Sequence, residues 1–75
     1  MNLRELRVNA VLSQAELALK AGVSRATIVE LEGGQKMPYP STIRKLAEAL
    51  DVPTGTVLAA IRAAMESAVE KRLAA

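Results

Sequence analysis

The stretch LSQAELALKAGVSRATIVELEGG, from Leu12 to Gly34, decides the fold, because it contains two helix starts in close succession. Ser13 is followed three residues later by Glu16, which is the spacing of a capping box at the start of a helix. This helix is predicted to run to about residue 21, where Gly22 can take the left-handed conformation that ends helices. Ser24 then has the residue type of an N-cap for a second helix.

Only about three residues separate the two predicted helices. A link this short forces them to cross at a steep angle, which is the geometry of a helix-turn-helix. At 3.6 residues per turn, Ile28 and Leu31 of the second helix fall on one face, toward the core. The outward face of that helix is predicted to carry Arg25, Ala26, Val29 and Glu30.

Working outward, the remaining chain also has helical patterns. Apolar residues recur at helical spacing in residues 2–9, 40–50 and 54–73. The paired glycines at 33–34 are expected to end the helix before them, and Pro40 suits the first turn of the helix after them. Asp51-Val52-Pro53 breaks the chain, and Thr54 is expected to cap the last helix. No segment alternates with period 2, so the fold class is predicted to be all-α, with five helices and an extended C-terminal helix.

Composition argues against an enzyme. The chain has 75 residues, enough for one small domain, and it has no cysteine and no histidine. The commonest metal ligands and the commonest general base are therefore missing. Its serines have no histidine to activate them, the glycine pair does not form a nucleotide loop, and its carboxylates lack metal-ligand spacing. We expect no catalysis, no cofactor, no metal and no small-molecule site.

Charge and hydropathy restrict the possible binding partners less strongly than composition restricts catalysis. The net charge of +2 permits nucleic-acid binding without requiring it. The longest apolar run is too short for a membrane span, and the N-terminus has polar residues at once rather than an apolar signal core. A cytoplasmic location, with no membrane partner, is the resulting expectation.

The chain resembles the phage repressor and Cro (XRE-like) family of helix-turn-helix DNA-binding proteins. The matching stretches are LRELR at 3–7, the 12–34 segment, Pro38, and IRKLAEALDV at 43–52. The resemblance implies a compact five-helix repressor-like domain over residues 3–58, with its helix-turn-helix at about 13–32. Residues 59–75 would be a C-terminal helical extension.

In this family the second helix lies across the DNA backbone and the third enters the major groove. Carried over by position, the resemblance implies DNA contacts from Gln14, Ser24, Arg25, Ala26, Thr27, Glu30, Gln35, Lys36 and Tyr39. It also implies a structural ion pair between Arg7 and Glu32. Glu30 departs from the family, which often has a basic or amide side chain there. A carboxylate repels phosphate but can accept a hydrogen bond from cytosine N4. We therefore interpret Glu30 as a residue that weakens general attraction to DNA and favours particular sequences.

The C-terminal helix carries an apolar stripe that continues past the family match. Leu58 and Ile61 are expected to pack on their own chain. Beyond them, Met65, Val69 and Leu73 are expected to contact a partner chain. A homodimer formed this way would place two reading helices on half-sites about 34–36 Å apart.

Three functions remain open from the sequence. The leading one is a sequence-specific double-stranded DNA-binding transcriptional regulator, acting as a repressor. The alternatives are an antitoxin or adaptor that uses the same fold to grip a protein partner, and a structural helical fragment of a larger assembly. DNA binding through Z phosphate contacts predicts a log–log salt slope near −0.9Z, which an apolar protein interface would not show.

Overall fold

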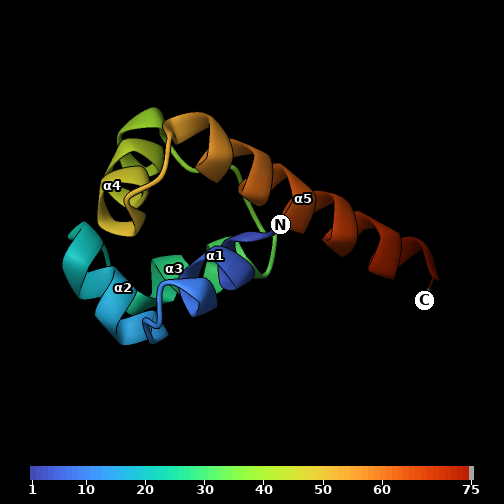
Figure 1. Cartoon of the computed structure of the whole chain (residues 1–75). Helices are drawn as coiled ribbons and strands as arrows, with labels where there is room; N and C mark the ends of the chain where they lie inside the picture. Colours follow the sequence, from blue (N-terminus) through green and yellow to red (C-terminus); the bar gives the residue numbers. More distant parts are fainter. Residues whose placement is uncertain (75) are drawn as a thin grey trace.

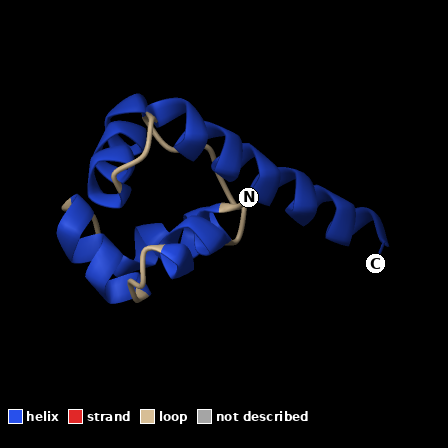
Figure 2. Ribbon diagram, viewed as in Figure 1, coloured by secondary structure: helices blue, strands red, loops and turns tan. Residues whose placement is uncertain are grey.

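The computed structural model describes residues 1–74, and all of its regular structure is helical. The helices are α1 (Leu3–Asn9), α2 (Gln14–Ala21), α3 (Arg25–Glu32), α4 (Pro40–Leu50) and α5 (Thr54–Ala74). Figure 1 shows α1, α2 and α3 on one side of the body and α4 on the other, with α5 leading away from it. Helices make up most of the described chain, and loops join them (Figure 2). The predicted all-α fold of five helices with a long C-terminal helix is confirmed.

The local signals read from residues 12–34 act as predicted. Ser13 Oγ accepts a hydrogen bond from the backbone N–H of Glu16 at 3.0 Å, and Ser13 N donates to Glu16 Oε1 at 2.9 Å, completing a capping box. Gly22 follows α2 with φ of 72°, in the left-handed region. Ser24 Oγ then accepts from Thr27 N at 3.1 Å and caps α3.

Two helix starts differ from the predictions by one residue. Asn2 was expected inside the first helix, but it is the N-cap of α1 and forms its own capping box with Glu5. Thr54 was expected to precede the last helix as its cap, but α5 already begins at Thr54. The break before α5 comes from Asp51, which takes a left-handed conformation with φ of 55° at the end of α4.

The core is aliphatic and draws on all five helices. Within residues 1–74 no buried side chain is polar or charged, which fits a sequence with a single aromatic residue and many alanines and leucines. The larger side chains that are fully buried are Leu3, Leu17, Ile28, Leu31, Leu46, Val57 and Ile61. Helices α2 and α3 are thereby fixed against α4 and α5, so the outward face of α3 is held on a rigid support.

Helix α5 belongs to the core for about half of its length. Ile61 is fully buried, Ala64 is buried, and Met65 is half-buried against the core. Beyond Met65 the helix projects past the rest of the body (Figure 1), and Val69 and Leu73 are 49% and 83% exposed. The predicted boundary at residue 58 thus falls inside a continuous helix. None of the helices in residues 1–74, α5 included, combines the length and apolar character needed to cross a bilayer.

Candidate nucleic-acid interface

Helices α2 and α3 are joined by residues 22–24 alone, and this short turn sets the presentation of α3. Ile28 and Leu31 are fully buried, which fixes the rotation of the helix about its axis. The opposite side carries exposed Arg25, Ala26 and Val29 and half-exposed Glu30. At 1.5 Å per residue, eight residues span about 12 Å, which matches the width of a DNA major groove.

A polar network ties α1 to the C-terminal end of α3. The Arg7 guanidinium donates from Nε to Glu32 Oε2 at 2.5 Å and from Nη2 to Glu32 Oε1 at 3.2 Å. Arg7 Nη1 also donates to the carbonyl of Leu12 at 2.9 Å. The two charged side chains are only 12% and 8% exposed, and the hydrogen bond with Glu32 raises the pKa of Arg7. The structure thus brings Arg7 and Glu32 together as a bidentate pair.

Gln14, at the start of α2, joins the same network. Its Nε2 donates to Glu32 Oε1 at 3.2 Å, so the side chain is oriented by the fold. No pattern in the sequence predicts this bond, because the two residues lie on different helices. Gln14 also lines a shallow depression of about 380 Å³ together with Arg25, Ala15, Ser13 and Arg7. The N-terminal ends of α2 and α3 therefore lie side by side, with Arg25 next to Gln14.

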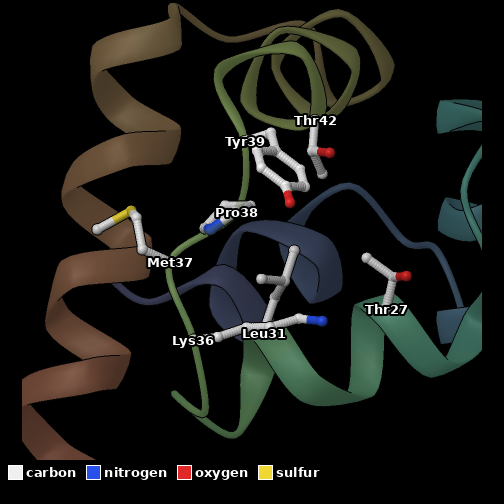
Figure 3. A pocket seen from close by; sticks show the side chains of 7 residues that line it. All are labelled: Thr27, Leu31, Lys36, Met37, Pro38, Tyr39 and Thr42. Carbon is white, nitrogen blue, oxygen red and sulfur yellow. The ribbon is translucent and has the colours of Figure 1, made fainter.

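A second hollow lies between α3 and the loop that follows it. Its volume is about 330 Å³, and Figure 3 shows side chains from α3, the loop and the start of α4 around it. The lining residues are Thr27, Leu31, Lys36, Met37, Pro38, Tyr39 and Thr42. Tyr39 is 82% exposed. The loop thus places Lys36 and Tyr39 beside α3 on one continuous surface.

The loop also supplies a partner for the unusual carboxylate of α3. Lys36 Nζ lies 2.8 Å from Glu30 Oε2, and both side chains are solvent-accessible. The hydrogen bond with Glu30 raises the pKa of Lys36. Sequence reasoning missed this pair, because six residues apart is not a spacing at which helix side chains meet. The pair forms because the chain turns back after Gly33 and Gly34.

The other predicted contact residues, Ser24, Thr27 and Gln35, lie in α3 or within three residues of its ends. Ser24 and Thr27 share a hydrogen bond of 2.9 Å between their hydroxyls, in addition to the capping bond. Gln35 is exposed, and its backbone N–H donates to the carbonyl of Glu30 at 3.2 Å. Roles for all of these side chains in binding DNA stay predictions. Within residues 1–74 no cluster of three or more acidic side chains could hold a metal ion.

Comparison with known proteins identifies the family that has this arrangement of helices. A helix-turn-helix family model, HTH_3, matches residues 3–57. The chain is 46% identical over 59 residues to "Uncharacterized HTH-type transcriptional regulator RghRB" of Bacillus subtilis (strain 168), covering 77% of this chain and 42% of that protein. It is 48% identical over 52 residues to "HTH-type transcriptional repressor RghR" of the same strain, covering 68% and 38%.

A third relative aligns with more of the chain. "Uncharacterized HTH-type transcriptional regulator Rv0023" of Mycobacterium tuberculosis (strain ATCC 25618 / H37Rv) is 37% identical over 73 residues, covering 97% of this chain and 28% of that protein. The chain thus spans about two-fifths or less of the length of these relatives. The family match covers α1 to the start of α5, which includes the α2–α3 pair described above. The chain therefore belongs to the HTH_3 helix-turn-helix family, of the repressor and Cro (XRE) type.

Proposed function

We propose that this chain is a sequence-specific double-stranded DNA-binding transcriptional regulator that reads the major groove with α3. One observation carries the proposal: α3 buries Ile28 and Leu31 and turns Arg25, Ala26, Val29 and Glu30 outward as one face. A helix in the major groove needs such a face, held rigidly enough that its side chains keep their register on the bases.

The ends of α3 supply that rigidity. Ser24 caps its first turn, and Glu32 anchors its last turn to Arg7. The side chains around it then divide into two roles. Arg25, Ala26 and Glu30 meet base edges, and Lys36 lies beside them in its ion pair with Glu30. Gln35 and Tyr39 in the same loop lie against the phosphate backbone. Ser24 and Thr27 contact the DNA backbone next to α3. Their hydroxyls already bond each other, which leaves them less free to bond base edges.

Repression is the mode of regulation that we propose. The similarity to the Bacillus protein named as a repressor supports it. A domain of this kind needs no further chemistry to repress, because occupying a promoter excludes other proteins. Such a regulator works in the compartment that holds the DNA, which is the cytoplasm in a bacterium.

Selection of bound fragments from random duplexes tests the proposal. We expect a preferred sequence to emerge and its affinity to fall with salt along a log–log line of slope near −0.9 per phosphate contact. If no duplex is enriched and the chain instead retains a protein partner with little salt dependence, the antitoxin or adaptor alternative replaces it.

We further propose that the chain works as a homodimer through the exposed end of α5. Val69 and Leu73 are apolar, exposed and on one stripe of a helix that projects from the body. Met65, the third residue of the predicted contact, lies at the base of this stripe and is half-buried against its own core. Val69 and Leu73 therefore carry the proposed contact.

Sedimentation of the full chain tests the dimer. The wild-type chain is expected to dimerise at micromolar concentrations, and the double variant Val69→Glu, Leu73→Glu to be monomeric and folded. Lys71→Glu is the matched control, because it adds the same kind of charge change off the stripe. A monomeric wild-type chain, or a double variant that still dimerises, contradicts the proposal.

A further inference from the structure

We propose that Glu30 and Lys36 act as one unit that reads a single C·G base pair, Glu30 accepting from cytosine N4 and Lys36 donating to guanine O6. The inference rests on the proposed DNA-binding function and assigns a specificity to part of that surface. Its starting point is the 2.8 Å contact between Lys36 Nζ and Glu30 Oε2 beside the outward face of α3.

Electrostatics explains why neither residue should act alone. An isolated carboxylate on a groove-facing helix is repelled by the phosphates on both sides of the groove. Lys36 removes that obstacle, because it brings a positive charge into hydrogen-bonding distance of Glu30 and makes the pair neutral. The two side chains are 61% and 37% exposed, so the pair remains accessible to a ligand.

Hydrogen-bonding capacity identifies the base pair. A carboxylate has two acceptor oxygens, and the ammonium of lysine has three donors. The contact between Glu30 and Lys36 uses only part of this capacity, so each side chain can make a further bond. The unit then presents an acceptor directly beside a donor.

The major-groove edge of a C·G pair offers the complementary pattern. Cytosine N4 is a donor and guanine O6 is an acceptor, and these two atoms are themselves hydrogen-bonded in the base pair. Their separation is therefore similar to that between Lys36 Nζ and Glu30 Oε2. An A·T pair puts an N6 donor beside an O4 acceptor but adds the bulky thymine methyl next to that acceptor, where the lysine stem would pass.

The loop geometry gives the unit its fixed place. The backbone N–H of Gln35 donates to the carbonyl of Glu30 at 3.2 Å, directly before Lys36. Gly34 lies with φ of +69° against the backbone of α5, so the path of the loop is constrained. Lys36 thus returns to α3 as a consequence of the fold.

The experiment is a double-mutant cycle in DNA binding. A preferred duplex is first selected with the wild-type chain, and each base pair in it is then exchanged in turn. Wild type is expected to show one C·G position at which exchange weakens binding by about tenfold or more. Glu30→Gln, which keeps an acceptor oxygen but loses the ion pair with Lys36, and Lys36→Met should each weaken the preference at that position and leave the preferences elsewhere unchanged.

The overall affinities separate the unit from two independent contacts. Lys36→Met leaves the negative charge of Glu30 without a neutralising partner, so it should weaken binding to all duplexes. Adding Glu30→Gln removes that charge and should recover much of the lost affinity. The salt slope should be nearly unchanged, because no phosphate contact is removed. Lys71→Met is the matched control, since it removes one lysine charge at the far end of α5 and should leave base preference intact.

Distinct results overturn the inference. In one such result, Lys36→Met weakens binding by the same factor in the wild-type protein and in the Glu30→Gln variant, and it lowers the magnitude of the salt slope by about 1. Lys36 is then an independent phosphate contact. If the wild-type chain selects a sequence without a C·G position sensitive to Glu30→Gln, the unit does not read that pair. Absence of any DNA binding by the wild-type chain would instead contradict the proposed function itself.

Discussion

Gly34 lies directly against the backbone carbonyl of Ala64, so the loop after α3 touches the middle of α5. A Cβ at position 34 would overlap the carbonyl oxygen of Ala64 and lie 2.7 Å from its carbonyl carbon. Backbone atoms cannot move aside as a flexible side chain can. Gly34 also has φ of +69°, which non-glycine residues adopt only with strain. This contact joins the loop after α3, the proposed reading helix, to α5, which carries the proposed dimer contact.

Gly34→Ala should therefore destabilise the protein severely. The left-handed conformation contributes about 1–2 kcal/mol and the steric overlap about 1–3 kcal/mol more. Urea unfolding measures the sum, and two other glycines provide controls. Gly22→Ala carries only the conformational penalty, since nothing lies within 4 Å of a Cβ there. Gly33→Ala carries neither, since its φ is −79° and a Cβ there would lie 3.4 Å or more from its neighbours. A Gly34 variant no less stable than the Gly22 variant would contradict the close contact.

The bidentate pair of Arg7 and Glu32 should contribute more than a surface ion pair. Because both side chains are about nine-tenths buried, removal of one leaves the other desolvated without its partner. Arg7→Ala and Glu32→Ala should each lower the free energy of unfolding by roughly 1–3 kcal/mol, against 0.2–1 kcal/mol for an exposed pair. The double variant should lose much less than the sum. Lys36→Ala, which breaks the exposed pair with Glu30, is the control and should change stability little.

The capping box of α2 should make stability depend on acid. The backbone N–H of Ser13, and then its hydroxyl, hold the pKa of Glu16 below its usual value. A pKa lowered in the folded state adds stability above the unfolded value of about 4.3, and this is lost as the pH falls through the folded value. Glu16→Gln should thus be less stable than wild type at pH 7, with the difference shrinking as the pH falls below the unfolded pKa and Glu16 becomes protonated. Glu48→Gln on the exposed side of α4 is the control, and an unchanged difference across this range would contradict the assignment.

Val11 has a strained backbone conformation, and a substitution can relieve that strain. It has φ of 58°, a region that β-branched residues rarely occupy, and its side chain is 86% exposed, so it contributes little packing. Val11→Asn should raise stability by up to about 1 kcal/mol, because asparagine tolerates the left-handed conformation. Val11→Ala should fall between the two. Thermal unfolding of the three proteins provides the ranking, and a less stable Asn variant would show that the turn is not strained.

Most of the fold could be predicted because its signals are local. Ser13 with Glu16, Gly22 and Ser24 lie within one or two turns of the ends they control, so spacing alone identifies them. The burial of Ile28 and Leu31 follows from helical periodicity, and it also determines which side of α3 faces outward. Val11 gave no signal, because nothing in its residue type indicates a left-handed conformation.

The parts of the site that could not be predicted depend on how the chain folds back on itself. The bond from Gln14 to Glu32 joins residues eighteen apart, and the pair of Glu30 with Lys36 depends on the course of the loop after Gly34. Spacing rules describe neighbours along one helix and have no bearing on such contacts. The resemblance to a family suggested Arg7 with Glu32, but it could not indicate that Glu30 has a partner.

Arg25 tests whether the outward face of α3 reads bases. It lies in the first turn of α3 beside Gln14. Among the described residues 1–74 it has no ion-pair partner, in contrast to Arg7 and Lys36. Its fork of donors can bond guanine O6 and N7 together, so Arg25→Ala should weaken binding to the selected duplex on the order of tenfold to a hundredfold. The loss on scrambled duplexes should be much smaller. Arg25→Lys keeps the charge but loses the bidentate fork, so it should recover nonspecific affinity without recovering base preference. Lys20→Ala, at the opposite end of α2, controls for loss of one charge. Equal losses on selected and scrambled DNA, both rescued by lysine, would show that Arg25 neutralises phosphate instead of reading a base.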